Sequence, residues 1–231
     1  MPKKSQLESK GESYIPAFSH RLLTPFYDFI MKWAALEPIF KPHLVMQARL
    51  KRSYRILDVG CGTATLIILI KKTQPESEVV GLDGDLEILE IAKSKTAKAG
   101  FSIRLDYGMA FELPYPSDSF DRVFSSMVLH HLTRENKLRS VKEMFRVLKS
   151  NGELHVADFG KPQNLMMHIV SLIMRRLEET SDLIQGLLPE MLRKAGFYQV
   201  EETAKFMTAF GTIVLVRARK LSALSTADRS Y

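Results

Sequence analysis

The stretch ILDVGCGTAT (56–65) places two glycines directly after a short apolar run. Gly60 and Gly62 let the backbone turn sharply and approach a ligand closely, and a helix starting behind them would point its N-terminal end at a carboxylate or a phosphate. A nicotinamide-dinucleotide site has a third glycine where Thr65 stands. Asp58, just before the turn, suits a positively charged ligand such as an ammonium or a sulfonium. A tight strand-to-helix turn without a ligand is the alternative interpretation.

A second acid follows the next apolar run. Asp83 comes 23 residues after Gly60, at the end of the stretch 78–82. A carboxylate at the end of the second strand can accept both hydroxyls of an adenosine ribose. Asp83 and Asp85 both precede the helix expected from residue 86, so either could cap it. We assign the ribose to Asp83 and the helix cap to Asp85.

Apolar runs that alternate with helical patterns must position these residues. We predict strands over 55–59, 78–82, 101–105, 120–125 and 153–157. Helices are predicted around 66–70, 85–99 and 137–148, and a strand pair at the sheet edge over 200–203 and 212–217. This alternation predicts a parallel α/β sheet, whose ligands bind beyond the carboxyl ends of the strands.

Five blocks together resemble the class I S-adenosylmethionine-dependent methyltransferases, and are most similar to the group that includes the ubiquinone/menaquinone C-methyltransferases. The blocks are ILDVGCGTAT (56–65), VVGLDGD (79–85), ELPYPSDSFDRVFSSMVLHHL (112–132), EMFRVLKSNGELHVADF (143–159) and LRKAGFYQV (192–200). The resemblance implies a Rossmann-like, doubly wound α/β fold. Its seven-stranded, mostly parallel sheet would have the order 3-2-1-4-5-7-6 with an antiparallel last strand and helices on both faces.

The resemblance also implies a binding site for S-adenosylmethionine, with S-adenosylhomocysteine as the product. The methionine end would be held by Asp58, Gly60, Cys61 and Gly62, and we expect no nucleophilic role for the cysteine. The ribose and adenine would be held by Asp83, Gly84, Met109 and Ala110, and the end of the fourth strand would contribute Ser125 and Ser126. We also place Tyr27, from the N-terminal segment, at the cofactor. The family usually has glycine at Ala64 and often has aspartate at Met109.

A base is needed when the methyl acceptor is a hydroxyl or a carbon acid, whereas a neutral amine needs little help. His130 and His131 follow the predicted strand 120–125, and Asp158 follows 153–157. These three are our catalytic candidates. The alternative is packing or capping for the histidines, and capping of the following loop for the aspartate. The histidines and the cysteine show no metal-ligand spacing, so we predict no metal.

Charge separates the middle of the chain from its two flanks. The 231 residues carry a net charge of +7, but 1–52 hold +5, 53–160 hold −1 and 161–231 hold +3. We therefore expect no basic groove across the central body and disfavour a nucleic-acid partner. The single cysteine excludes an intrachain disulfide, and the absence of 18 successive apolar residues disfavours a membrane span. We expect a cytoplasmic protein, either a monomer or a homodimer.

We divide the chain into a disordered basic tail (1–13), a helical lid (14–52), a methyltransferase domain (53–220) and a flexible tail (221–231). The lid could instead be a helix packed on the sheet edge. Within the domain, 161–187 would be an insertion on the substrate side. Its apolar, Met-rich part, 165–174, could line an acceptor pocket, form a dimer contact, touch a membrane surface peripherally or pack in the core.

The apolar insertion favours a small, apolar or aromatic acceptor, methylated by in-line displacement. The basic flanks motivate an alternative, a methyltransferase acting on RNA or protein. Against it, the end of the fourth strand reads SSMV (125–128) rather than the Asn/Asp-Pro-Pro-Tyr type used on bases and glutamine. Ala64 and Met109 motivate a third hypothesis, a cofactor-binding partner protein without catalysis.

Overall fold

The computed structural model describes residues 37–165, 167–168, 180–208 and 211–221. Tyr27, the predicted tail 1–13 and residues 222–231 therefore lie outside the described residues, as do most of the predicted lid and much of the insertion 161–187. Among the helices that the structure describes, none is both long and apolar enough to cross a membrane.

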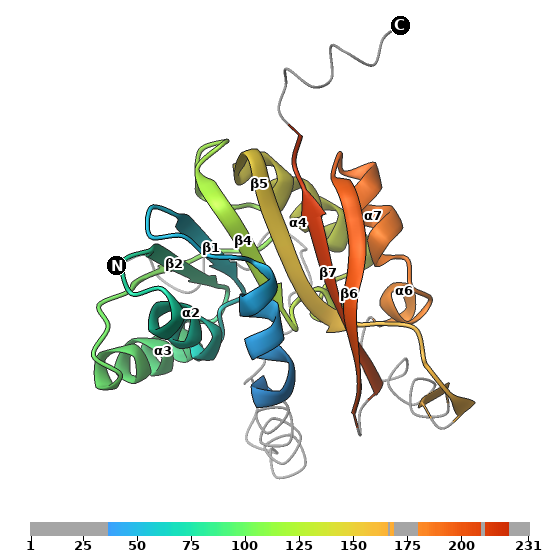
Figure 1. Cartoon of the computed structure of the whole chain (residues 1–231), viewed down its shortest axis with the longest axis horizontal. Helices are drawn as coiled ribbons and strands as arrows, with labels where there is room; N and C mark the ends of the chain where they lie inside the picture. Colours follow the sequence, from blue (N-terminus) through green and yellow to red (C-terminus); the bar gives the residue numbers. More distant parts are fainter. Residues whose placement is uncertain (1–36, 166, 169–179, 209–210, 222–231) are drawn as a thin grey trace, which may run out of the picture.

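The described residues form one seven-stranded sheet (Figure 1). Its strands are β1 (Arg55–Val59), β2 (Glu78–Asp83), β3 (Arg104–Tyr107), β4 (Phe120–Ser126), β5 (Leu148–Phe159), β6 (Tyr198–Thr208) and β7 (Gly211–Arg219). The order is β3-β2-β1-β4-β5-β7-β6. Strands β1 to β5 pair in parallel, and β7 runs antiparallel to both β5 and β6. The fold and strand order predicted by the resemblance are confirmed.

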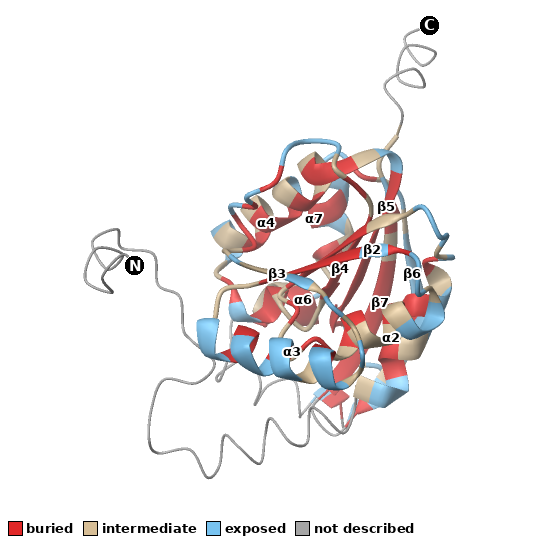
Figure 2. Cartoon of the chain, turned by 90° about the vertical axis from the view of Figure 1, so that its left-hand side faces the viewer, coloured by how far each residue is buried: buried red, intermediate tan, exposed pale blue. Residues whose placement is uncertain are grey.

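Helices cover both faces of the sheet, each over its own apolar core (Figure 2). On one face lie α2 (Thr65–Thr73), α3 (Leu86–Lys98) and a helix over 37–47. On the other face lie α4 (Arg134–Val147), α6 (Ser181–Ile184) and α7 (Leu188–Lys194). Residues alternate between the faces along each strand. In β1, Leu57 packs in the core beneath α4, α6 and α7, whereas Ile56 packs in the core beneath α2 and α3.

The helix over 37–47 packs on the sheet through Phe40, Leu44, Val45 and Ala48, all buried. This helix lies within the predicted lid, 14–52, most of which falls outside the described residues, so the assignment of that segment stays a prediction. Its last turn lies against β4, because Arg122 Nε donates a hydrogen bond to the Ala48 carbonyl at 3.0 Å. The helix therefore reaches from the carboxyl ends of the strands toward their amino ends.

Caps and turns fix where the elements begin. Asp85 caps α3, accepting hydrogen bonds from the backbone N–H groups of Glu87 and Ile88 at 2.9 and 3.3 Å. Thr133 caps α4 through the Asn136 N–H. Some boundaries differ from the sequence prediction: the third strand is Arg104–Tyr107 rather than 101–105, and β5 is considerably longer than 153–157.

Candidate functional site

The turn between β1 and α2 is held in a left-handed conformation at Gly60 (φ +69°) and Gly62 (φ +53°). The backbone N–H groups of Gly60 and Cys61 donate to the Leu82 carbonyl at 2.7 and 3.0 Å, which ties the turn to β2. A Cβ on Gly62 would meet no atom of the described residues within 4 Å, whereas one on Gly60 would lie 2.3 Å from Val128 Cγ2. The turn is therefore packed beneath Gly60 and open in front of Gly62.

Asp58 is a buried carboxyl, 1 % exposed, and neither of its oxygens has a hydrogen-bond partner among the described residues. Burial raises its pKa to about 7; the Lys41 charge opposes this shift, and the acids Asp83 and Glu37 add to it. Lys41 comes from the helix over 37–47 and pairs with Glu37 at 2.7 Å. A buried carboxylate without a partner is costly, which favours a cationic ligand at this position.

Asp83 ties the turn to the end of β2. One carboxylate oxygen accepts from the Gly62 N–H at 2.8 Å and the other from the Asp85 N–H at 3.0 Å. Burial raises the pKa of Asp83, and these backbone donors oppose the shift. Each oxygen keeps an acceptor position for a further donor. The carboxylate is therefore fixed in orientation by the turn that it supports, with Gly84 beside it.

The other predicted cofactor residues lie at the neighbouring strand ends. Met109 and Ala110 follow β3, in a loop that the Gly108 N–H attaches to the Asp83 carbonyl at 3.0 Å. Ser125 and Ser126 end β4, and their buried hydroxyls have no hydrogen-bond partner among the described residues. The carboxyl ends of adjacent parallel strands thus bring the predicted residues together, except Tyr27, which lies outside the described residues.

The three catalytic candidates form a connected cluster at the ends of β4 and β5. His130 Nδ1 lies 2.9 Å from Asp158 Oδ1. The other oxygen of Asp158 accepts from the Val128 and Leu129 N–H groups at 3.2 and 2.9 Å. Burial raises the pKa of Asp158, but His130 and the Phe159 N–H outweigh it, and the net shift is downward. The carboxylate is therefore ionised, accepts from the ring nitrogen, and holds the short helix η2 (Leu129–His131) in place.

The two histidines differ in exposure. The side chain of His130 is buried, whereas His131 is exposed, and their ring centroids lie 3.9 Å apart. Desolvation lowers the pKa of His131, and the His130 ring lowers it further, so the imidazole is neutral at pH 7. Both oxygens of Asp158 already accept hydrogen bonds, and His130 is buried, so His131 is the most exposed residue of the three.

Two lysines at the turn were missed by the sequence analysis. Lys41 acts on Asp58, and Lys95 Nζ donates to the hydroxyls of Thr63 and Thr65 at 3.1 and 2.6 Å. A signal for the first was present, because Lys41 shares a helical face with Leu44, Val45 and Ala48, all apolar and all buried. A lysine on an otherwise apolar face indicates that its ammonium group has a charged partner nearby. Cys61 is buried, and burial raises the pKa of its thiol, which leaves no thiolate at neutral pH.

Residues 50–207 match the family model of the methyltransferase domain. The chain belongs to the methyltransferase domain family. A demethylmenaquinone methyltransferase of Deinococcus radiodurans is 27% identical over 227 residues, which cover 94% of this family member and 92% of that protein. One of Listeria monocytogenes is 34% identical over 116 residues, so the chain spans about half (48%) of the length of that relative. The predicted family and enzyme class, an S-adenosylmethionine-dependent methyltransferase, are confirmed.

Solved structures show the same fold at low identity. The YcgJ protein of Bacillus subtilis superposes with a TM-score of 0.66 and 18% identity, covering 80% of this methyltransferase chain and all of the other. A putative methyltransferase of Bacillus halodurans gives a TM-score of 0.62 and 21% identity, covering 79% and 99%. These likenesses extend over nearly the whole described part of the chain.

Proposed function

We propose that the chain holds S-adenosylmethionine at the carboxyl ends of β1 to β4 and transfers its methyl group to a small, apolar or aromatic acceptor. One observation carries the proposal: the buried, unpartnered carboxyl of Asp58 beside the open turn at Gly62. Demethylmenaquinone, after which these relatives are named, is a molecule of the proposed kind, an aromatic ring with an apolar chain.

The amino-acid end of the cofactor is a zwitterion and needs partners of both signs. Asp58 supplies a carboxylate for its ammonium group, and Lys41 supplies an ammonium for its carboxylate. Asp83 has an acceptor position on each oxygen for the ribose hydroxyls. Met109 and Ala110 would flank the adenine, and a methionine side chain is suited to contact an aromatic face. The residues present therefore fit the cofactor.

The bound cofactor supplies the electrophile, a methyl group on a sulfonium. The chain's contribution is to hold the acceptor in line and to remove a proton where the acceptor is a hydroxyl or a carbon acid. We assign proton removal to the exposed, neutral His131. His130 and Asp158 are positioning residues, because Asp158 fixes both the His130 ring and the backbone of η2.

Calorimetry with S-adenosylhomocysteine tests the cofactor half of the proposal. The wild-type chain should bind, and Asp83→Asn should weaken binding on the order of 10- to 100-fold, since a hydrogen bond to a charged group is worth about 1.5–3 kcal/mol. Asp118→Asn is the matched control, an exposed aspartate in a turn at the other end of the sheet that pairs with Lys220. Absence of binding to the wild-type chain would refute the proposal.

Turnover tests the acceptor half, with a short-chain demethylmenaquinol analogue as the probe. His131→Gln should lower kcat by about 10²–10⁴-fold, the usual range for a general base, and leave cofactor affinity unchanged. Asp158→Asn should lower kcat and also shift its pH profile, because the His130 ring loses its negatively charged partner. Methylation of RNA or protein in place of the quinol would favour the macromolecular alternative, and cofactor binding without any turnover would favour the non-catalytic one.

A further inference from the structure

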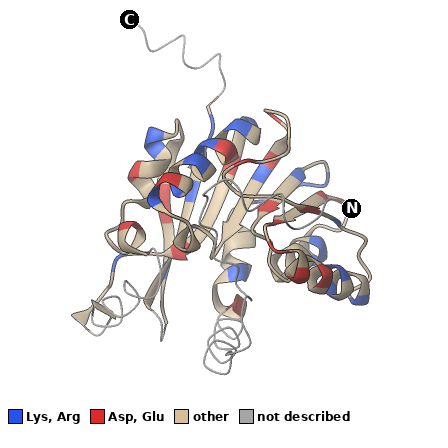
Figure 3. Cartoon of the chain, turned by 180° about the vertical axis from the view of Figure 1, so that it is seen from behind, with Lys and Arg blue, Asp and Glu red and all other residues tan. Residues whose placement is uncertain are grey.

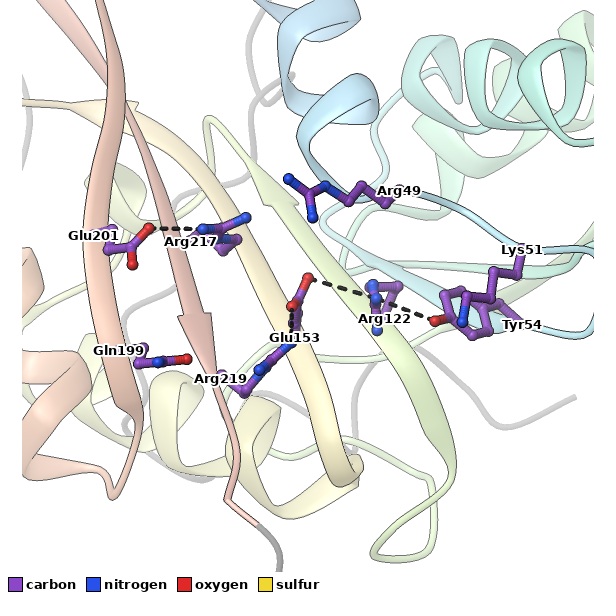
Figure 4. Close-up of a pocket in the computed structure, with 9 residues that line it drawn as sticks. All are labelled: Arg49, Lys51, Tyr54, Arg122, Glu153, Gln199, Glu201, Arg217 and Arg219. Carbon is purple, nitrogen blue, oxygen red and sulfur yellow. Dashed lines mark hydrogen bonds and ion pairs between the residues drawn. The ribbon is translucent and has the colours of Figure 1, made fainter.

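A pocket of about 460 Å³ lies toward the amino ends of the parallel strands (Figure 4). It opens beside the C-terminal end of the helix over 37–47 and extends across β4, β5, β7 and β6. Five basic side chains line it, namely Arg49, Lys51, Arg122, Arg217 and Arg219. Two acidic side chains, Glu153 and Glu201, also line it. Along β5 it lies about 16 Å from Asp158 at ~3.3 Å per residue, so it is separate from the candidate cofactor site.

The floor of the pocket is a buried, fixed ion-pair network. Glu153 pairs with Arg219 at 2.9 Å and with Arg122 at 3.5 Å, and both Arg122 and Glu153 are only 7 % exposed. Arg122 also donates to the Ala48 carbonyl and to the Tyr54 hydroxyl at 3.0 and 3.3 Å. Burial acts against ionisation of Glu153, but His155, Arg122 and Arg219 lower its pKa to about 2, so it is charged. On the floor, the single negative charge of Glu153 faces the two positive charges of Arg122 and Arg219, so the floor keeps a net positive charge.

Two cations on the rim have no ionic partner among the described residues. Among the described residues, the Arg49 side chain makes no hydrogen bond or ion pair, and the Lys51 ammonium group lies over the Tyr54 ring, 5.7 Å from its centroid. Arg217 pairs with Glu201 at 2.7 Å. Figure 4 shows the Arg49 side chain extending toward β5, and beyond β5 the Arg217 side chain, which is joined to Glu201. The rim therefore offers guanidinium groups from two sides of one recess.

The balance of charge and the size of the recess define the ligand. Five cations less two carboxylates leave a charge of +3. One guanidinium group can donate two parallel hydrogen bonds to two oxygens of a phosphate, and a phosphomonoester carries a charge of about −2 at neutral pH. We propose that this pocket binds the phosphate or diphosphate group of a small molecule or of a lipid headgroup. A nucleic acid would need an extended basic track, whereas the ribbon in Figure 3 shows acidic residues interspersed among the basic ones.

Titration calorimetry with sodium pyrophosphate tests the proposal at low and physiological salt. Wild-type binding should weaken at least about tenfold, or 1.4 kcal/mol, in the double variant Arg49→Gln, Arg217→Gln. The matched control is Arg193→Gln, Lys194→Gln, which removes two exposed charges from α7 on the other face of the sheet. Unchanged S-adenosylhomocysteine affinity in both variants would show that the fold is intact and would separate this result from the fate of the proposed methyl transfer. Arg49 is exposed, so Arg49→Glu provides a second variant with little risk to folding.

The remaining arms identify the source of the phosphate. For a lipid headgroup, the protein should sediment with phosphatidylcholine vesicles that contain phosphatidic acid, but not with vesicles that lack it. If the double variant loses this sedimentation, the result supports the pocket and assigns it to a lipid headgroup. Pyrophosphate binding without vesicle binding would support it and assign it to a soluble molecule. Equal loss in the α7 control, no pyrophosphate binding by the wild-type chain, or tighter binding of a single-stranded RNA than of pyrophosphate would overturn the proposal.

Discussion

Asp58 is a buried carboxyl in the candidate cofactor site whose protonation changes near neutral pH. Its folded pKa of about 7 lies above the ordinary value of 3.8, because burial disfavours the charged form. Between these two values the folded state holds a proton that the unfolded state releases. Stability therefore falls as pH rises through this window, by up to about 1.4 kcal/mol per pH unit, and levels off above pH 7.

Ligand affinity should follow the opposite trend. The ammonium group of S-adenosylhomocysteine pairs with the ionised carboxylate only, so affinity should rise up to about tenfold per unit between pH 6 and 7. Calorimetry across this range checks the slope, and Asp58→Asn should bind more weakly with the slope removed. A wild-type affinity that is flat from pH 5.5 to 7.5 would show that Asp58 does not face the ligand's charge.

At the residue scale, the strand-end acids and glycines could be predicted because they are adjacent to their own turns. Asp85 as the helix cap was equally local, and the structure confirms it. The contribution of Lys41 was missed although its place on an apolar helical face was a signal, because its effect on Asp58 depends on how the helix over 37–47 packs on the sheet. Likewise, nothing in the sequence showed that Asp158 spends its oxygens on His130 and on the backbone of η2.

The element that defines the site is the turn between β1 and α2. Both of its glycines have positive φ, but only Gly60 is covered by a neighbouring element. Because Val128 belongs to the segment that Asp158 holds, the turn, the end of β4 and the end of β5 support one another. A change in any one of them should therefore be felt at the other two.

A pair of alanine substitutions separates conformational strain from contact. Gly62→Ala should cost about 1–2 kcal/mol for its left-handed backbone, since no atom of the described residues obstructs the new methyl group. Gly60→Ala should cost about 1–3 kcal/mol more, because its Cβ would lie 2.3 Å from Val128 Cγ2. Urea denaturation measures both. Val128→Ala should recover part of the extra loss in the Gly60→Ala background, and no recovery would mean that the strain has another origin.

Element order was predictable from the alternation of apolar runs and the five motif blocks, but lengths were not. The strand pair β6 and β7 extends well beyond 200–203 and 212–217 because the two strands pair with each other along their length, and β6 accommodates two irregularities in register. Pairing partners decide such lengths, and they are invisible in one sequence. The segment 165–174 stays a prediction, since most of it lies outside the described residues.

At the scale of the whole molecule, charge has been redistributed by folding. The segment sums predicted no basic groove, yet the first flank contributes Arg49 and Lys51 to the same recess that receives Arg217 and Arg219 from the last. Summing charge along a chain misses this, because β7 returns antiparallel and places its final residues beside the amino ends of the parallel strands. The fold therefore brings basic residues from both flanks together in one pocket.

Glu153→Gln should trade stability for anion affinity. Removing the carboxylate leaves Arg122 buried beside a neutral partner and should cost about 1.5–3 kcal/mol of unfolding free energy, measured in urea at pH 7. The folded pKa of about 2 lies below the ordinary 4.5, so the stability due to this carboxylate is lost as pH falls from 4.5 to 2, and the variant should lose less. Pyrophosphate should bind the variant more tightly, and weaker binding would contradict the proposed pocket.

The helix over 37–47 lies at both the candidate cofactor site and the basic pocket. Lys41 stands beside Asp58 near one end, and Ala48 is held by Arg122 at the other, about 10 Å further along the axis at 1.5 Å per residue. Both sites therefore share one helix. If a ligand at either site shifts this helix, the two ligands become thermodynamically linked, and each then changes the other's affinity by the same factor.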